Sequence, residues 1–289
     1  VNLLTTGSEH DASQSRSVRA GTLVKTNGNS KPLNRGKILV VEDNPTNQRV
    51  ATLQLAELGY ASQAVYNGQE ALEEMSRNDY DLVFMDCQMP DMDGFEATKQ
   101  IRRQEALTGR HVPIVAMTAH AMSEDKYRCL NAGMDDYVSK PVRPRRLQSI
   151  LDRFLPLPDS ERDDSKATAE RNNEARQETG APVDVDTLRA ELGEEESGEV
   201  YKMFVKSTDA LLAKLNAAVA GKDMPQLQRA LHELKGVSES VGATELAKLA
   251  RTAEQELNQG DWSKVQQSPA SMRAAFDRAH NFLSTNSLV

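Results

Sequence analysis

The chain has 289 residues, of which 38% are hydrophobic and 4% aromatic, and its 43 acidic and 35 basic residues give a net charge of −8. A chain of this size and composition is expected to form two modest domains rather than one large core. The acidic balance excludes a general nucleic-acid-binding surface, because such a surface needs a basic face. No apolar run approaches the length of a membrane span.

Residues 1–35 are rich in Ser, Thr, Asn and Gly and show little periodicity. Such a segment cannot bury enough apolar surface to offset its chain entropy, so we expect a flexible lead-in. The sequence begins with Val1 rather than Met, so we expect it to be part of a longer protein, which could be anchored in a membrane. The two cysteines, Cys87 and Cys129, lack metal-ligand spacing, which indicates a reducing cytoplasm.

Residues 36–155 alternate between short apolar runs and amphipathic stretches. Strands are predicted at 38–41, 60–65, 81–86, 112–117 and 136–139, and a helix follows each of them. This alternation predicts an α/β doubly wound, five-stranded parallel sheet. We expect the first helix, at 47–58, to place Val50, Leu53, Leu55 and Leu58 on its inner side.

Residues 156–182 separate this domain from a second one. They are dense in charge and contain no Leu, Ile, Val, Phe or Met between Asp159 and Gly180. We therefore predict a disordered linker, with a solvated helical spacer as the competing interpretation. Residues 183–287 show helical periodicity only, with helices predicted at 186–192, 198–219, 225–241, 244–257 and 269–283. Short connections between amphipathic helices predict an all-α antiparallel helical bundle.

Chemistry-bearing side chains follow four strands of the predicted sheet. Glu42 and Asp43 follow the first strand, Asp86 ends the third, Thr118 follows the fourth and Lys140 follows the fifth. The carboxyl ends of parallel strands meet at one edge, so these groups should converge. Three carboxylates that converge need a cation, and oxygen ligands of this kind suit Mg²⁺. Together with a hydroxyl and an ammonium, they provide what phosphoryl transfer requires.

The segments VVEDN, FMDCQMPDMDG, AMTA and YVSKPV resemble, in this order, those of a response-regulator receiver domain with its flavodoxin-like fold, over residues 36–155. The resemblance implies these roles: Asp86 as phosphoacceptor, Glu42, Asp43, Asp86 and the backbone carbonyl of Gln88 as Mg²⁺ ligands, Thr118 and Tyr137 as switch residues, and Lys140, before a cis Pro141, as the phosphate-binding ammonium.

The helical half carries one distinctive histidine. On the helix at 226–241, Leu227, Leu231 and Leu234 fall on the inner face, and His232 and Lys235 fall on the opposite face. We expect His232 to be exposed and to act as a nucleophile through Nε2, with Lys235 stabilising the incoming phosphoryl group. Gly236 has no side chain and would let another protein approach His232 closely. The segment HELKGVSESVGA resembles a histidine phosphotransfer (HPt) domain, here over residues 183–287.

A receiver followed by an HPt domain is the arrangement at the C-terminal end of hybrid sensor histidine kinases. The resemblance implies a two-component phosphorelay module, in which Asp86 accepts a phosphoryl group from a phosphohistidine with Mg²⁺ and His232 hands it to a downstream response regulator. The upstream partner would be a histidine kinase core in the same parent chain. No ATP-binding glycine pattern is present, so phosphotransferase activity is expected only as part of the larger kinase. Two alternatives stay open: a regulatory docking module with an idle His232, and a phosphate sink that drains a downstream regulator through His232 and Asp86.

Overall fold

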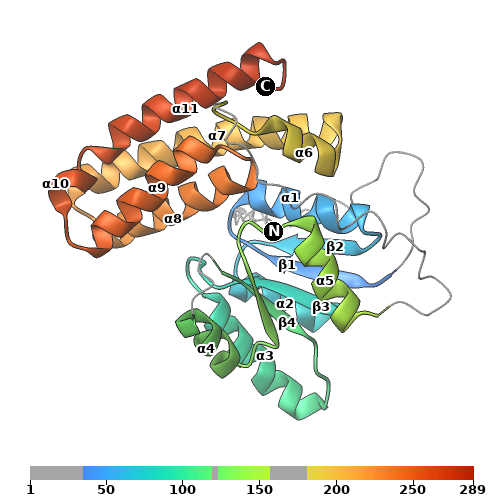
Figure 1. Ribbon diagram of the computed structural model, residues 1–289. Coiled ribbons are helices and arrows are strands. Elements are labelled where there is room, and N and C mark those ends of the chain that lie inside the picture. Colours follow the sequence, from blue (N-terminus) through green and yellow to red (C-terminus); the bar gives the residue numbers. More distant parts are fainter. Residues whose placement is uncertain (1–34, 119–122, 157–180) are drawn as a thin grey trace, which may run out of the picture.

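The computed structural model in Figure 1 describes residues 35–118, 123–156 and 181–289. The predicted lead-in, apart from Arg35, and all but the ends of the predicted linker lie outside the described residues. Two domains are seen: an α/β domain that contains the elements from Lys37 to Phe154, and a helical domain that contains those from Val185 to Thr285.

The α/β domain is a five-stranded parallel sheet in the order β2-β1-β3-β4-β5. This is the predicted doubly wound sheet, and the central strands β1, β3 and β4 are almost wholly buried because helices cover both faces. Its elements are β1 (Lys37–Val41), α1 (Pro45–Glu57), β2 (Ala61–Val65), α2 (Gly68–Arg77), β3 (Leu82–Asp86), α3 (Gly94–Thr108), β4 (Ile114–Thr118), α4 (Ser123–Ala132), β5 (Asp136–Ser139) and α5 (Pro144–Phe154).

Each face of the sheet has its own apolar core. Alternate residues of a strand point to opposite faces, so Leu39 packs on one side and Val40 on the other. Helices α2, α3 and α4 cover the first face, and α1 and α5 cover the second. The carboxyl ends of all five strands therefore meet at one edge, as predicted.

The helical domain is built on four long helices that pack as a bundle (Figure 1). Helix α7 contacts α8 and α11, and α9 contacts the same two helices. The elements are α6 (Val185–Leu192), α7 (Glu194–Gly221), α8 (Met224–Ser240), α9 (Thr244–Asn258), α10 (Trp262–Val265) and α11 (Ser268–Thr285). Helix α10 was not predicted, because four residues are too few to show a helical period. Helix α7 begins four residues earlier than predicted, with three glutamates in its first turn, where the helix dipole favours negative charge.

Helix α1 joins the two domains, and here one prediction was wrong. Leu55 packs on the sheet as expected. Val50 and Leu53, which were also expected on the inner side, instead belong to the core of the helical domain. Helix α1 contacts α6, α7 and α8 (Figure 1). Its buried apolar residues are therefore shared between the cores of the two domains. None of the helices in the described residues combines the length and apolar character needed to cross a membrane.

This packing predicts that Leu53→Asp separates the two domains. The leucine side chain is buried, and a carboxylate in its place would be desolvated against the helical domain unless the domains part. We expect a larger radius of gyration in solution X-ray scattering and faster amide exchange in α6 and α8. Leu107→Asp, at an exposed position of α3, is the matched control and should change neither. Unchanged scattering for Leu53→Asp would contradict the packing.

Candidate functional site

The acidic edge of the sheet is built around the end of β3. Asp86 is its last residue and is buried. The following loop folds back so closely that a Cβ atom at Gly94 would lie 2.1 Å from the backbone oxygen of Asp86, so only glycine fits there. Asp93 then caps α3 by accepting a hydrogen bond from the Glu96 backbone N–H over 2.8 Å. The loop after Asp86 is thus held at both ends.

Lys140 links two of the predicted carboxylates. Its Nζ donates to Oδ2 of Asp86 over 2.7 Å and also to Oε2 of Glu42. Burial alone would lower the pKa of this ammonium, but the charges of Asp86 and Glu42 outweigh burial and raise it. Lys140 is therefore cationic at every physiological pH. The peptide bond between Lys140 and Pro141 is cis, as expected.

Carboxylate oxygens of Glu42, Asp43 and Asp86 all lie within 4.8 Å of one another. Burial, followed by the charges of Glu42 and Asp86, raises the pKa of Asp43 to about 8, although Lys140 opposes the shift. Burial likewise raises the pKa of Glu42. When all three carboxyl groups are ionised, the single ammonium of Lys140 leaves two negative charges unbalanced. A divalent cation with a preference for oxygen fits this donor set in charge and in ligand type.

The other predicted receiver residues surround this cluster. The backbone N–H of Gln88 donates to Oδ1 of Asp86 over 3.1 Å, which keeps the Gln88 peptide beside the carboxylate. Thr118 ends β4 and is buried. Tyr137 on β5 is half-buried, and the ammonium of Lys126 lies 5.5 Å from the centre of its ring. Thr118 therefore lies at the same edge of the sheet as Asp86, while Tyr137 lies further back in β5, beside Ala116 of β4.

The histidine of the helical domain differs from its prediction. His232 is not exposed, because its side chain keeps only 17% of its accessible surface. Lys235 is not a solvated neighbour, because it is buried and its Nζ donates to Oε2 of Glu254 on α9. The helical period of α8 alone could not reveal these contacts, since Glu254 on α9 is the partner of both side chains.

Glu254 organises this second cluster. Its Oε1 lies 3.2 Å from Nδ1 of His232, while its other oxygen accepts from Lys235. Burial alone would raise the pKa of Glu254, but the hydrogen bonds from His232 and Lys235 and the Lys235 charge hold it at about 2. An ionised carboxylate can only accept, so Nδ1 is the nitrogen that carries the proton, and in the neutral ring Nε2 carries the lone pair. The geometry thus prepares Nε2 as the nucleophilic nitrogen.

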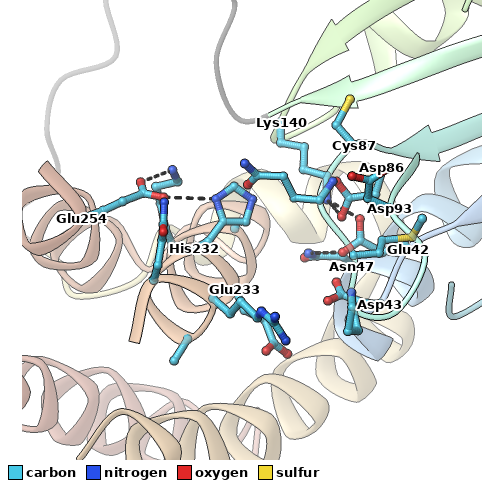
Figure 2. Close-up of a pocket in the computed structure, with 18 of the residues that line it drawn as sticks. Glu42, Asp43, Asn47, Asp86, Cys87, Asp93, Lys140, His232, Glu233 and Glu254 are labelled. Carbon is cyan, nitrogen blue, oxygen red and sulfur yellow. Dashed lines mark hydrogen bonds and ion pairs between the residues drawn. The ribbon is translucent and has the colours of Figure 1, made fainter. Parts of the chain in front are cut away.

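The two clusters line one cavity of about 620 Å³ at the junction of the domains. Asp43, Asp86 and Lys140 lie on one wall, and His232 and Glu254 on the other. In Figure 2 the imidazole of His232 stands between Glu254 and the carboxylates of the sheet edge. The cavity therefore brings together the two residues that were predicted to carry phosphate.

Gly236 lies where α8 approaches α1 at this junction. A Cβ atom there would lie 3.7 Å from Nδ2 of Asn47 on α1, so a larger side chain would meet the α/β domain. Asn47 in turn donates to Oε1 of Glu42 over 2.8 Å. The residue chosen from the sequence as a point of close approach thus faces the acidic site of the other domain.

Glu254 and Asn47 are the functional candidates that the sequence did not indicate. Glu254 falls on the inner face of α9, next to Ala250 and Ala253, which are buried. A carboxylate on an apolar stripe is expensive without a partner, and this is the signal that could have found it. Asn47 sits in the first turn of α1, four residues after Asp43 of the acidic strand end, which is a weaker signal.

Comparison with known proteins gives two family matches. Residues 38–152 match the response regulator receiver domain, and residues 199–282 match the Hpt domain. Sensor protein GacS of Pseudomonas syringae pv. syringae is 34% identical over 77% of this chain, and Histidine kinase 1 of Arabidopsis thaliana is 41% identical over 43%. The chain covers only 25% and 13% of these relatives.

Among solved structures, one similar protein is the receiver domain of a Pseudomonas aeruginosa PAO1 sensor histidine kinase, described with a magnesium ion in its active-site cleft. It is 46% identical and covers 42% of this chain and 98% of its own, with a TM-score of 0.39. The domain matches and the relatives agree on one family. The chain is a two-component signalling protein with a receiver domain followed by an Hpt domain, and its homologues are hybrid sensor histidine kinases.

Proposed function

We propose that the chain is a phosphorelay module in which Asp86 accepts a phosphoryl group from a phosphohistidine and passes it to His232. The observation that carries this proposal is the single cavity lined by both residues. Transfer between two protein groups needs both of them to face the same enclosed space, because positioning supplies much of the catalysis. The shared cavity favours this function over a docking module with an idle His232.

In the receiver domain, Glu42, Asp43, Asp86 and the backbone carbonyl of Gln88 would hold Mg²⁺. The ion, when bound, neutralises charge that builds up on the phosphoryl oxygens. Lys140 already lies 2.7 Å from Asp86, so it is placed to bind a phosphoryl oxygen once Asp86 carries an acyl phosphate. The hydroxyl of Thr118 and the ring of Tyr137 are proposed to respond to that phosphoryl group.

In the Hpt domain, Nε2 of His232 attacks the phosphorus atom. The P–N bond forms as the bond between phosphorus and the Asp86 oxygen breaks, and Asp86 leaves as a carboxylate. The Nδ1 proton stays on the ring, which becomes a phosphorylated imidazolium. Glu254, 3.2 Å from Nδ1, balances this new positive charge, and Lys235 keeps Glu254 ionised and in place.

The partners follow from the same chemistry. We propose an upstream phosphohistidine on a kinase core, and a receiver domain of a separate response regulator downstream. This assignment places both domains in the cytoplasm, where ATP supplies the kinase and where the buried Cys87 and Cys129 stay as free thiols. A phosphate sink uses the same two residues in reverse, and it differs only in the net direction of transfer.

A labelling experiment tests the relay. The wild-type chain, incubated with acetyl phosphate and Mg²⁺, should acquire both base-labile acyl phosphate and acid-labile phosphohistidine. Asp86→Asn should lose both labels, because His232 receives its phosphate through Asp86. His232→Gln should keep the acyl phosphate and lose the phosphohistidine. Phosphohistidine in Asp86→Asn under these conditions would contradict the proposed route.

Glu254→Gln tests whether Glu254 supports His232 as the nucleophile. The variant keeps an acceptor for Nδ1 but loses the charge that balances the phosphorylated ring, so we expect transfer to His232 to slow by about a hundredfold. The variant also leaves the buried Lys235 without a counter-charge, which should cost about 3 kcal/mol of Hpt stability. Urea unfolding and rapid-quench transfer measure the two effects. Glu256→Gln is the control, because Glu256 lies two residues further along α9 and so points to another side of the helix. Equal slowing in both variants would contradict the role of Glu254.

The raised pKa of Asp43 predicts that Mg²⁺ binding competes with protons. With a pKa of about 8, Asp43 is mostly protonated at pH 6 to 7 and must lose its proton to bind a cation. Affinity for Mg²⁺ should therefore rise with pH, by about tenfold per pH unit, and level off above pH 8. Calorimetric titration in buffers of different ionisation enthalpy measures both affinity and proton release. Asp43→Asn should bind weakly with no such dependence, and pH-independent binding by the wild type would refute this account.

A further inference from the structure

A carboxylate of the Hpt domain faces the acidic site of the receiver domain. Glu233 follows His232 on α8, and its Oε1 accepts a hydrogen bond from Nδ2 of Asn44 over 3.1 Å. Asn44 is the residue directly after Asp43 and is fully buried. Glu233 and Asp43 line the same cavity, and Figure 2 shows them on facing sides of it. Docking of the two domains therefore fixes Glu233 beside the acidic site.

The carboxylate of Glu233 lacks a cationic partner. Among the residues that the structure describes, no Lys, Arg or His forms an ion pair with it, and its hydrogen bond from Asn44 comes from a neutral amide. Lys214 and Arg229 also line the cavity, but both are exposed, so water screens their charges. The charge of Glu233 is one cause of the raised pKa of Asp43, which shows that it acts across the domain boundary.

The effect of Glu233 on docking depends on whether a cation is bound. Without one, Glu233 adds a fourth carboxyl group to those of Glu42, Asp43 and Asp86, and repulsion between the ionised groups opposes docking. With a divalent cation in the site, the same carboxylate is attracted to the ion, which favours docking. Within the described part of the chain, the oxygens close enough to share one ion belong to Glu42, Asp43 and Asp86, so Glu233 acts through its charge and not as a direct ligand.

We propose that Glu233 couples cation binding to domain docking, so that Mg²⁺ binds more tightly to the docked chain and in turn holds the Hpt domain on the receiver domain. The proposal rests on the proposed function, because it concerns the same ion. It adds a positioning role for Glu233, which favours the arrangement with His232 facing Asp86 when the cation is bound. The coupling is reciprocal: docking raises the affinity for Mg²⁺ by the same factor by which Mg²⁺ raises the docking equilibrium constant.

Calorimetric titration of the full chain with Mg²⁺ tests the coupling. Work at about pH 9 keeps Asp43 ionised in every variant, so proton competition does not contribute to the comparison. Glu233→Gln retains an acceptor for the Asn44 amide but loses the charge, and we expect its affinity for Mg²⁺ to fall by about fivefold.

The effect of Glu233→Gln should depend on docking. In the Leu53→Asp chain, whose domains are expected to part, Glu233 is far from the acidic site, so adding Glu233→Gln should leave the affinity for Mg²⁺ unchanged. Asp277→Asn is the matched control, because it removes a negative charge from the same domain at a side chain on α11 that is 58% exposed and lies outside the cavity. It should change the affinity in neither background.

Amide exchange measures the reciprocal effect without any change in the apolar core. Mg²⁺ should slow exchange in α6 and α8 of the wild-type chain, and it should do so by less in Glu233→Gln. Equal affinities of the wild type and Glu233→Gln would overturn the proposal, as would an equal loss of affinity in the Leu53→Asp background or exchange that Mg²⁺ does not slow. These outcomes differ from a failure of the proposed function, in which the wild-type chain itself would bind no Mg²⁺ or form no phosphohistidine.

Discussion

The packing of α1 between two cores is the constraint on which the rest of the structure depends. A helix in an α/β sheet normally buries one apolar stripe, but α1 buries Leu55 against the sheet and Val50 and Leu53 against the helical bundle. The same helix begins directly after the acidic end of β1. Its position therefore fixes the acidic site relative to α8 and brings Asp86 and His232 to one cavity.

The two walls of that cavity are electrostatically different. The receiver wall holds three carboxyl groups against Lys140, and with all three ionised it is short of positive charge until a cation binds. The Hpt wall is balanced, because Glu254 is matched by Lys235 and by the Nδ1 proton of His232. The first wall is thus arranged to hold a phosphoryl group with the help of an ion, and the second to accept it without one. Glu233 adds a link, since its charge contributes to the raised pKa of Asp43 in the other domain.

The fold and the receiver site could be predicted from the sequence because their signals are local. Asp86 ends one predicted strand and Lys140 follows another, and parallel strands bring their carboxyl ends together whatever the loops do. The Hpt site could be predicted only in part. The sequence indicated His232 and Gly236, but Lys235 pairs with Glu254 from another helix, and this depends on how α8 and α9 pack. The second apolar face of α1 was missed for the same reason. The apolar pattern predicts that Val50 and Leu53 are buried, but it does not say which domain buries them.

The central claim is that the two phosphate-carrying residues face each other within one chain, and the order of the transfer reaction tests it most directly. In a docked chain, the effective concentration of His232 near phosphorylated Asp86 is fixed by the fold. The rate constant for transfer in the wild-type chain should then stay unchanged over about a hundredfold dilution. A rate that falls in proportion to protein concentration would contradict the account, because it would show that His232 receives its phosphate from another chain.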